Sequence, residues 1–234
     1  MTTILPPPDE KPAAVQRMFD HIAPSYDRVN RIITLGMDQR WRRKLLAQLG
    51  IRPGDVVLDL ATGTGDFAQM VRETAVAHVV ALDFSRGMLL AAQQRPAEEI
   101  MLVQGDGLRL PLADASIDVA VSGFALRNFS SIPPVLAELA RVVKRGGRIG
   151  LLEVDRPQSR LVRLGHATYF ERIVPVLGGL LSHDRNAYNY LPKSAIYLPE
   201  ERELVRMLQN AGFERIQKGR PMFGAIQSLR AVRA

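Results

Sequence analysis

Apolar runs alternate with amphipathic stretches through the middle of the chain, and this alternation predicts the fold. Five runs rich in Val, Ile and Leu have the length of buried strands. They are Val56–Leu60, His78–Asp83, Ile100–Gln104, Ile117–Ser122 and Arg148–Val154. Helical periodicity occupies Phe67–Arg72, Met88–Gln94 and Pro133–Lys144 between them. Strands that alternate with helices predict an α/β fold with a doubly wound, Rossmann-like, mostly parallel sheet.

The N-terminal part is predicted to be helical and to lie outside the sheet. Residues 1–14 are rich in proline, and we expect a flexible tail there. Residues 15–50 show short apolar periodicities that predict a helical cap. Its helices are expected at Val15–His21, at Asp27–Leu35 and from a capping Asp38 to Leu49, and the proline-containing stretch Ala23–Asp27 is expected to break the helix between the first two.

The C-terminal part departs from the strand–helix alternation. Residues 156–199 form an insertion that we expect to cover a substrate pocket. A last helix at Glu200–Asn210 precedes two strands, Phe213–Gln217 and Ala225–Val232, which predict an antiparallel hairpin. Residues 15–234 are therefore expected to form a single domain.

Composition fits a globular protein and excludes several chemistries. The 234 residues are 47% hydrophobic and 24% charged, with no cysteine. A disulfide, a thiolate metal site and a cysteine nucleophile are thus excluded. The chain lacks an apolar run of the ~18 residues that span a bilayer, and its start lacks a signal-peptide pattern, so we expect a cytoplasmic location. The net charge of +7 permits contact with nucleic acid or an anionic membrane, although a solvated basic surface is the simpler interpretation.

A glycine turn follows the first predicted strand and is the first candidate for ligand binding. Asp59 stands near the strand's end, and Gly63 and Gly65 allow the backbone to turn tightly beside a ligand. Such a turn suits a dinucleotide, S-adenosylmethionine (SAM) or no ligand at all. Because a carboxylate repels a pyrophosphate, Asp59 favours SAM. The stretch resembles the first motif of class I SAM-dependent methyltransferases.

Polar residues also follow the next strands, at the same predicted edge. Asp83 ends the second strand about 24 residues after Asp59, near the spacing at which nucleoside-binding folds place an acid on the ribose. Asp106 and Gly107 follow the third strand, where an acid can bind the adenine amino group. Ser122 begins the loop after the fourth strand. Each acid alone is commonly a surface residue, but together they predict a SAM site.

Longer motifs resemble the C-methyltransferases of quinone biosynthesis, which methylate demethylmenaquinol and, in some members, a ubiquinol precursor. They cover nearly the whole chain, roughly residues 15 to 226. These motifs are Met18-Phe19-Asp20-x-Ile22-Ala23-Pro24-x-Tyr26-Asp27, Asp83-Phe84-Ser85-x-x-Met88-Leu89, Gly123-Phe124-x-Leu126-Arg127-Asn128, Arg141-Val142-Val143-Lys144-Arg145-Gly146-Gly147-Arg148 and Ala187-Tyr188-x-Tyr190-Leu191-Pro192.

The resemblance implies roles for individual residues. Cofactor contacts would fall on Thr64, Asp83, Phe84, Asp106, Gly107 and Ser122, beside Asp59, Gly63 and Gly65 of the turn. Arg127, Asn128 and Tyr26 would be the catalytic residues, and a homodimer is what the family suggests. Departures from the family pattern at Asp38, Asp155 and Leu198 lie on the expected substrate side. They leave a naphthoquinol and a benzoquinol open as substrates.

The implied chemistry requires a phenolate but no metal. A ring carbon of a quinol becomes a strong nucleophile once the neighbouring phenol, of pKa ~10, is deprotonated. We therefore expect Arg127 to favour the phenolate and Asn128 to orient a hydroxyl. The alternative is that Arg127 only pairs with an acid such as Asp155.

The substrate class also bears on partners. Isoprenoid quinols reside in the bilayer, so we expect transient contact with the inner face of the membrane through the basic cluster Arg40–Lys44. A nucleic acid partner is not expected, because a pyrimidine-C5 methyltransferase needs a cysteine and the motif of amino-group methylation is absent after the fourth strand. Two alternatives remain. One is a methyltransferase that acts on RNA or on a different small aromatic compound, and the other is a non-catalytic SAM-binding protein.

Overall fold

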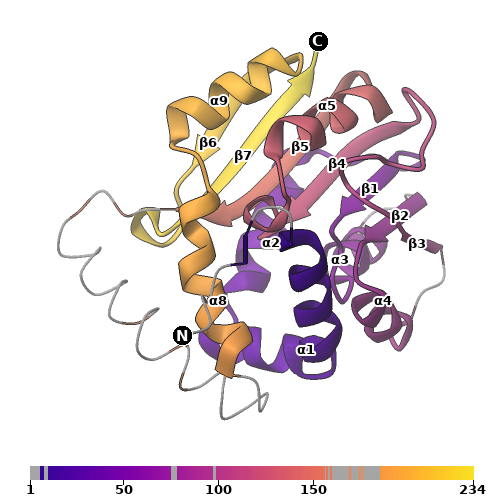
Figure 1. The fold of residues 1–234 in the computed structure, drawn as a ribbon. Helices are drawn as coiled ribbons and strands as arrows, with labels where there is room; N and C mark the ends of the chain where they lie inside the picture. The colour runs from indigo at the N-terminus through magenta and orange to yellow at the C-terminus, as the bar shows by residue number, and fades with distance from the viewer. Residues whose placement is uncertain are drawn as a thin grey trace.

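The computed structural model describes residues 6–7, 10–74, 78–96, 99–155, 157, 159, 169, 174, 176 and 185–234. Seven strands form one sheet of order β3-β2-β1-β4-β5-β7-β6 (Figure 1). The strands are β1 (Val56–Leu60), β2 (His78–Asp83), β3 (Ile100–Gln104), β4 (Ile117–Gly123), β5 (Val143–Val154), β6 (Phe213–Gly219) and β7 (Ile226–Arg233). β1 to β5 pair in parallel, and β7 is antiparallel to both β5 and β6. The predicted doubly wound sheet and its C-terminal hairpin are confirmed.

Helices cover both faces of this sheet. One core lies under α2 (Met37–Leu49) and α3 (Asp66–Thr74), and a second lies under α5 (Ile132–Val142) and α9 (Glu201–Asn210). Alternate residues along a strand face opposite cores; Val57 packs in the first, and Leu58 in the second. The described residues also form the helices α4 (Arg86–Gln93) and α8 (Arg185–Ser194), with the 3₁₀ turns η1 (Leu126–Asn128), η3 (Ala195–Tyr197) and η4 (Met222–Gly224).

The N-terminal region forms one long helix, α1 (Lys11–Ile33), where we predicted two short helices and a break. Pro24 lies inside this helix and removes one backbone hydrogen bond. The apolar face of α1, with Ile22, Ala23 and Val29, is buried against Met88 of α4 and Tyr188 of α8. Burial of this face offsets the lost hydrogen bond, so the prediction of a break at Ala23–Asp27 is wrong.

The start of α1 also shifts the predicted boundary of the tail. Lys11 is buried, and its Nζ donates to the carbonyl of Phe129 at 2.7 Å. Residues 11–14, predicted as tail, belong to α1. Residues 1–5 and 8–9 lie outside the described part of the chain. The prediction that Asp38 caps α2 is also wrong, because Gly36 (φ 71°) is the N-cap and Asp38 accepts hydrogen bonds from Arg31 and Arg42.

The predicted insertion at 156–199 is described only in part. Most of its apolar stretch Leu161–Leu181 lies outside the described residues, whereas α8 and η3 carry the aromatic residues Tyr188, Tyr190 and Tyr197. Figure 1 shows α1 and α8 near the edge toward which β4 and β5 point, and the two helices are in contact. A helix from the N-terminal region and one from the predicted insertion thus meet at this edge of the sheet, where the predicted site residues are expected.

Candidate active site

The turn after β1 is built by the backbone and by Asp59 together. Gly63 and Gly65 have φ of 57° and 88°, as a glycine turn requires, and Ala61 also has a positive φ of 54°. The carboxylate of Asp59 is buried and accepts hydrogen bonds from the hydroxyl of Thr62 and the backbone N–H of Ala68. Burial raises the pKa of Asp59 to about 7. Asp59 thus holds the turn in shape from within.

A cavity opens above this turn at the carboxyl ends of β1, β2 and β4. Its empty volume is about 850 Å³, including the solvent at its mouth. Five of the predicted cofactor residues line it: Gly63, Asp83, Phe84, Asp106 and Gly107. Leu60 and Leu82 supply apolar wall from the sheet, and Pro12, Val15 and Phe19 supply it from α1. A largely apolar cavity with a few convergent polar groups is typical of a small-molecule site.

Backbone hydrogen bonds hold Asp83 at the edge of this cavity. Its Oδ2 accepts from the N–H of Gly63 at 2.7 Å, and its Oδ1 accepts from the N–H of Ser85 at 2.8 Å. Burial raises the pKa of Asp83 to about 6, although these backbone hydrogen bonds oppose that shift. The carboxylate therefore joins the glycine turn to the start of α4 and still faces the cavity.

Four predicted cofactor residues lie outside the wall of this cavity. They are Asp59, Thr64, Gly65 and Ser122. The hydroxyl of Thr64 donates to Asp27 of α1, and the hydroxyl of Ser122 donates to the carbonyl of Leu60 at 2.8 Å. Both side chains thus brace the turn and its neighbours.

Of the three predicted catalytic residues, Tyr26 and Asn128 line the cavity and Arg127 does not. Arg127 is buried in an ion pair with Glu153, not with Asp155, which pairs with Lys218 at 2.8 Å. Burial raises the pKa of the Tyr26 phenol, and the charges of Arg42 and Arg127 oppose that shift. Arg127 is thus a buried cation behind the wall that Tyr26 and Asn128 form.

The polar contacts that join α1 to the start of α4 were not predicted from the sequence. Gln16 donates to the carbonyl of Phe84 at 3.1 Å, and Asp20 accepts from the hydroxyl of Ser85 at 2.7 Å. Asp27 pairs with Arg95, two residues beyond the end of α4. A helical periodicity read without interruption through Pro24 would have placed these residues on one helix.

Sheet order and site together define a class I SAM-dependent methyltransferase, with a glycine turn and an acid at the end of β2. The chain is similar to a SAM-dependent methyltransferase from Thermotoga maritima, described as a possible histamine N-methyltransferase, with a TM-score of 0.68. The two are 19% identical, and the match covers 94% of this chain and 100% of that one. At this identity the likeness shows the fold.

Sequence comparison then identifies the family. The model of the ubiE/COQ5 methyltransferase family matches residues 8–233. A demethylmenaquinone methyltransferase from Roseiflexus sp. is 42% identical over 214 residues, 91% of this chain and 90% of that protein. One from Deinococcus radiodurans is 42% identical over 208 residues, 87% of this chain and 86% of that protein. The chain belongs to the ubiE/COQ5 methyltransferase family, and it is a methyltransferase that uses SAM.

Proposed function

We propose that the protein methylates a ring carbon of a demethylmenaquinol-type isoprenoid quinol. The observation that carries this proposal is the 42% identity, over 91% of the chain, with a demethylmenaquinone methyltransferase. Support also comes from the cavity, whose apolar wall from α1 and the sheet suits an aromatic substrate. Tyr26 and Asn128 offer polar groups in that wall.

The site residues divide into cofactor and substrate groups. When bound, SAM would supply an electrophilic methyl group from its sulfonium. The ring carbon would take up this methyl group as the S–CH₃ bond breaks and leaves a neutral thioether, and the ring proton would pass to water. Asp83 would accept hydrogen bonds from the ribose hydroxyls and Asp106 one from the adenine amino group, while Gly63 and Gly107 would let the backbone approach the cofactor. Asp59, Thr64, Gly65 and Ser122 act on the cofactor by holding the turn.

The substrate group favours the phenolate of the quinol. Tyr26 and Asn128 orient the quinol hydroxyl, because both stand in the cavity wall. The buried charge of Arg127 stabilises the phenolate from behind that wall. Stabilising the phenolate increases the fraction of bound quinol that is nucleophilic at neutral pH.

The proposal includes contact with the membrane, since an isoprenoid quinol is dissolved there. None of the helices within the described ranges is long and apolar enough to cross a bilayer. A corner surface is suited to docking: Leu35 is 79% exposed with φ 52°, and Arg40, Arg43 and Lys44 are exposed on α2 beside it. None of the ion pairs among described residues includes these three cations. An apolar tip beside unpaired cations is complementary to an anionic lipid surface.

The experiment that tests the proposed function is mass spectrometry of the quinone pool in a strain that lacks this protein. We expect the unmethylated quinone to accumulate and the wild-type gene to restore the methylated one. A quinone pool that is unchanged by the deletion would contradict the proposal. The ring system of the accumulated quinone would also identify the substrate as a naphthoquinol or a benzoquinol.

A further inference from the structure

Arg127 is held by two elements that lie far from it in the sequence. It belongs to η1, directly after β4, and is 6% exposed. Its Nη1 forms an ion pair with the carboxylate of Glu153, near the end of β5. Its Nε donates to the hydroxyl of Ser194, at the end of α8, at 3.1 Å. The planar guanidinium is therefore held at two of its nitrogens, Nη1 and Nε.

The neighbouring Asn128 is held in the same way. The phenol of Tyr190, also on α8, donates to Oδ1 of Asn128 at 3.3 Å. The Nδ2 of Asn128 donates to the carbonyl of Phe124 at 3.3 Å. Both residues of the Arg-Asn pair thus depend on side chains of α8 for their orientation.

The stability of the fold is not a sufficient reason for the pair between Arg127 and Glu153. Both side chains are buried, at 7% and 1% exposure, and a buried ion pair often stabilises a protein no more than apolar side chains of the same volume. The second carboxylate oxygen of Glu153, Oε2, is buried and accepts no hydrogen bond from the described residues. The pair thus needs another reason, and orientation of Arg127 is one.

The charge of Arg127 acts on phenols next to the cavity. It lowers the pKa of both Tyr26 and Tyr190, against the larger effect of burial. Tyr26 stands in the cavity wall, and Tyr190 binds Asn128 in that wall. A cation that favours the ionised form of two protein phenols is placed to do the same for a substrate phenol.

We propose that Glu153 is a positioning residue, whose ion pair with Arg127, aided by the hydroxyl of Ser194, fixes the guanidinium behind Tyr26 and Asn128. This inference rests on the proposed methylation of a quinol. Fixing the cation keeps its charge on the side where the phenolate forms and costs no reorganisation during the reaction. Glu153 itself does not touch the substrate.

The test compares Glu153→Gln with the wild type in kcat, KM and the pH dependence of kcat. Glutamine keeps the shape but weakens the hold on Arg127, so we expect kcat to fall roughly tenfold or more while the Kd of SAM changes less than twofold. The pKa above which kcat levels off should move to higher pH, because the loosened cation favours the phenolate less. Glu153→Asp should recover part of kcat.

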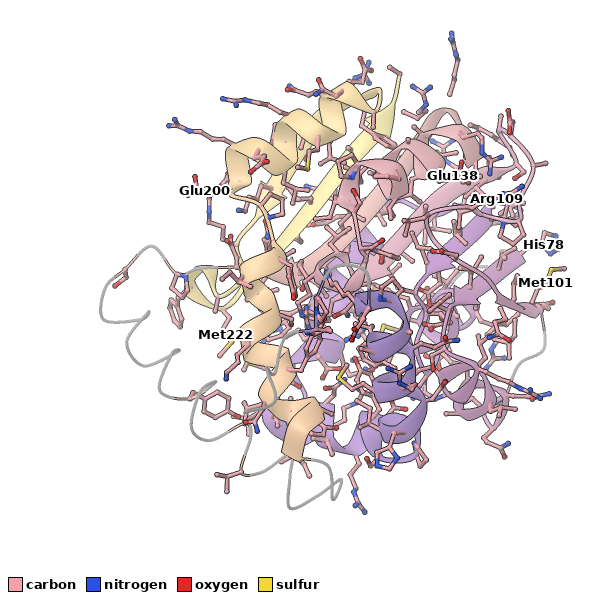
Figure 2. The ribbon with its side chains drawn as sticks, in the orientation of Figure 1. His78, Met101, Arg109, Glu138, Glu200 and Met222 are labelled. Carbon is pink, nitrogen blue, oxygen red and sulfur yellow. The ribbon has the colours of Figure 1, made fainter. Side chains whose placement is uncertain are left out.

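Ser194→Ala covers the case in which Glu153→Gln does not fold, because it frees only Nε of Arg127 and leaves the ion pair intact. We expect the same direction of change with a smaller loss of kcat. The matched control is Glu138→Gln, which breaks a glutamate–arginine pair with Arg141; Glu138, labelled beside Arg109 in Figure 2, lies away from α1 and α8. This control should leave kcat and its pH dependence unchanged.

Two results would overturn the inference. One is wild-type kcat and pH dependence in folded Glu153→Gln and Ser194→Ala. The other is a shift of the pKa to lower pH, which is expected if Glu153 only subtracts charge from Arg127. The ¹⁵Nε–H signal of Arg127 can be assigned by its loss in Arg127→Lys. Its proton should exchange slowly with water in the wild type and rapidly in Glu153→Gln. A protected signal in a protein that leaves the quinol unmethylated would overturn the proposed function instead.

Discussion

At the scale of single residues, Asp83 accepts hydrogen bonds from the backbone of the turn and is the group that we propose binds the ribose of SAM. Replacing it with Ala removes the acceptor for the ribose hydroxyls. Loss of charge-assisted hydrogen bonds costs about 1.5–3 kcal/mol, so the Kd of SAM should rise about 10- to 150-fold by calorimetry. Asp114→Ala is the control, since Asp114 is 78% exposed and pairs with Arg141. An unchanged Kd in Asp83→Ala would exclude the ribose role.

Asp83 also predicts how SAM binding depends on pH. Because the pKa of Asp83 is raised to about 6, its carboxylate is ionised above pH 6 and becomes protonated as the pH falls through that value. The Kd of SAM should therefore rise up to about tenfold between pH 7.5 and pH 5. In Asp83→Asn this dependence should be flat. Wild-type affinity that stays constant or increases toward pH 5 would contradict the prediction.

The same raised pKa affects stability in the opposite sense. The folded apoprotein binds a proton at Asp83 more tightly than the unfolded chain does, since the unfolded pKa is near 3.9. Stability from this group is therefore fully present below about pH 4 and is lost as the pH rises through about 6. Bound SAM, which favours the carboxylate, should reverse that trend.

Residue identity alone predicted the positions of some site residues better than those of others. Gly63, Asp83 and Asp106 were predicted from sequence because strand ends and glycine turns fix where such residues lie. The acid that pairs with Arg127 was not predicted, because Glu153 and Asp155 lie only two positions apart, one near the end of β5 and one just after it. Only the register of the sheet decides which one faces Arg127. Asp59 was predicted to bind the cofactor, and its carboxylate accepts hydrogen bonds from Thr62 and Ala68 within the turn.

At the scale of elements, α1 is the least predictable part and forms one wall of the cavity. Gly87 of α4 allows α1 to approach, since a Cβ at this position would lie 2.7 Å from Cα and 2.8 Å from the carbonyl oxygen of Asp20. Gly87→Ala must therefore displace α1. We expect the free energy of unfolding to fall by about 1–3 kcal/mol and SAM to bind more weakly.

Denaturant unfolding and calorimetry on Gly87→Ala check this expectation. Leu90→Ala is the control on the same helix, because Leu90 is 50% exposed and a surface substitution changes stability by less than about 0.5 kcal/mol. Wild-type stability and SAM affinity in Gly87→Ala would mean that α1 does not pack on α4 as described.

Local signals predicted the strands well but failed where tertiary packing overrides them. The five parallel strands were predicted within a few residues except β5, which begins at Val143 and not at Arg148. Val143 pairs with Ile117 across an irregular register, a non-local contact that local periodicity does not contain. Pro24 was predicted to end a helix, but Ile22, Ala23 and Val29 around it are buried against α4 and α8, and this packing keeps the helix continuous.

At the scale of the whole molecule, the corner surface of Leu35, Arg40, Arg43 and Lys44 predicts how the protein meets a bilayer. The wild type should float with vesicles that contain phosphatidylglycerol and less with phosphatidylcholine alone. Leu35→Asp should reduce flotation, because it places a charge at the apolar tip. Leu90→Asp is the control, as an exposed leucine on another helix.

Two results of the flotation experiment would contradict the docking proposal. The wild type could stay in the soluble fraction with and without anionic lipid, or Leu90→Asp could reduce flotation as much as Leu35→Asp. Neither result would bear on methylation of a quinol presented in detergent micelles. Docking and chemistry are therefore tested separately.

The central claim is that this SAM site serves a quinol ring, and transfer of a labelled methyl group tests it most directly. The protein is incubated with methyl-labelled SAM and either reduced demethylmenaquinone in micelles or total RNA. We predict label in the quinone extract, carried by a C–CH₃ group that resists hydrolysis, and none in RNA. Label in RNA alone, in an O-methyl ether, or in neither fraction would contradict the account.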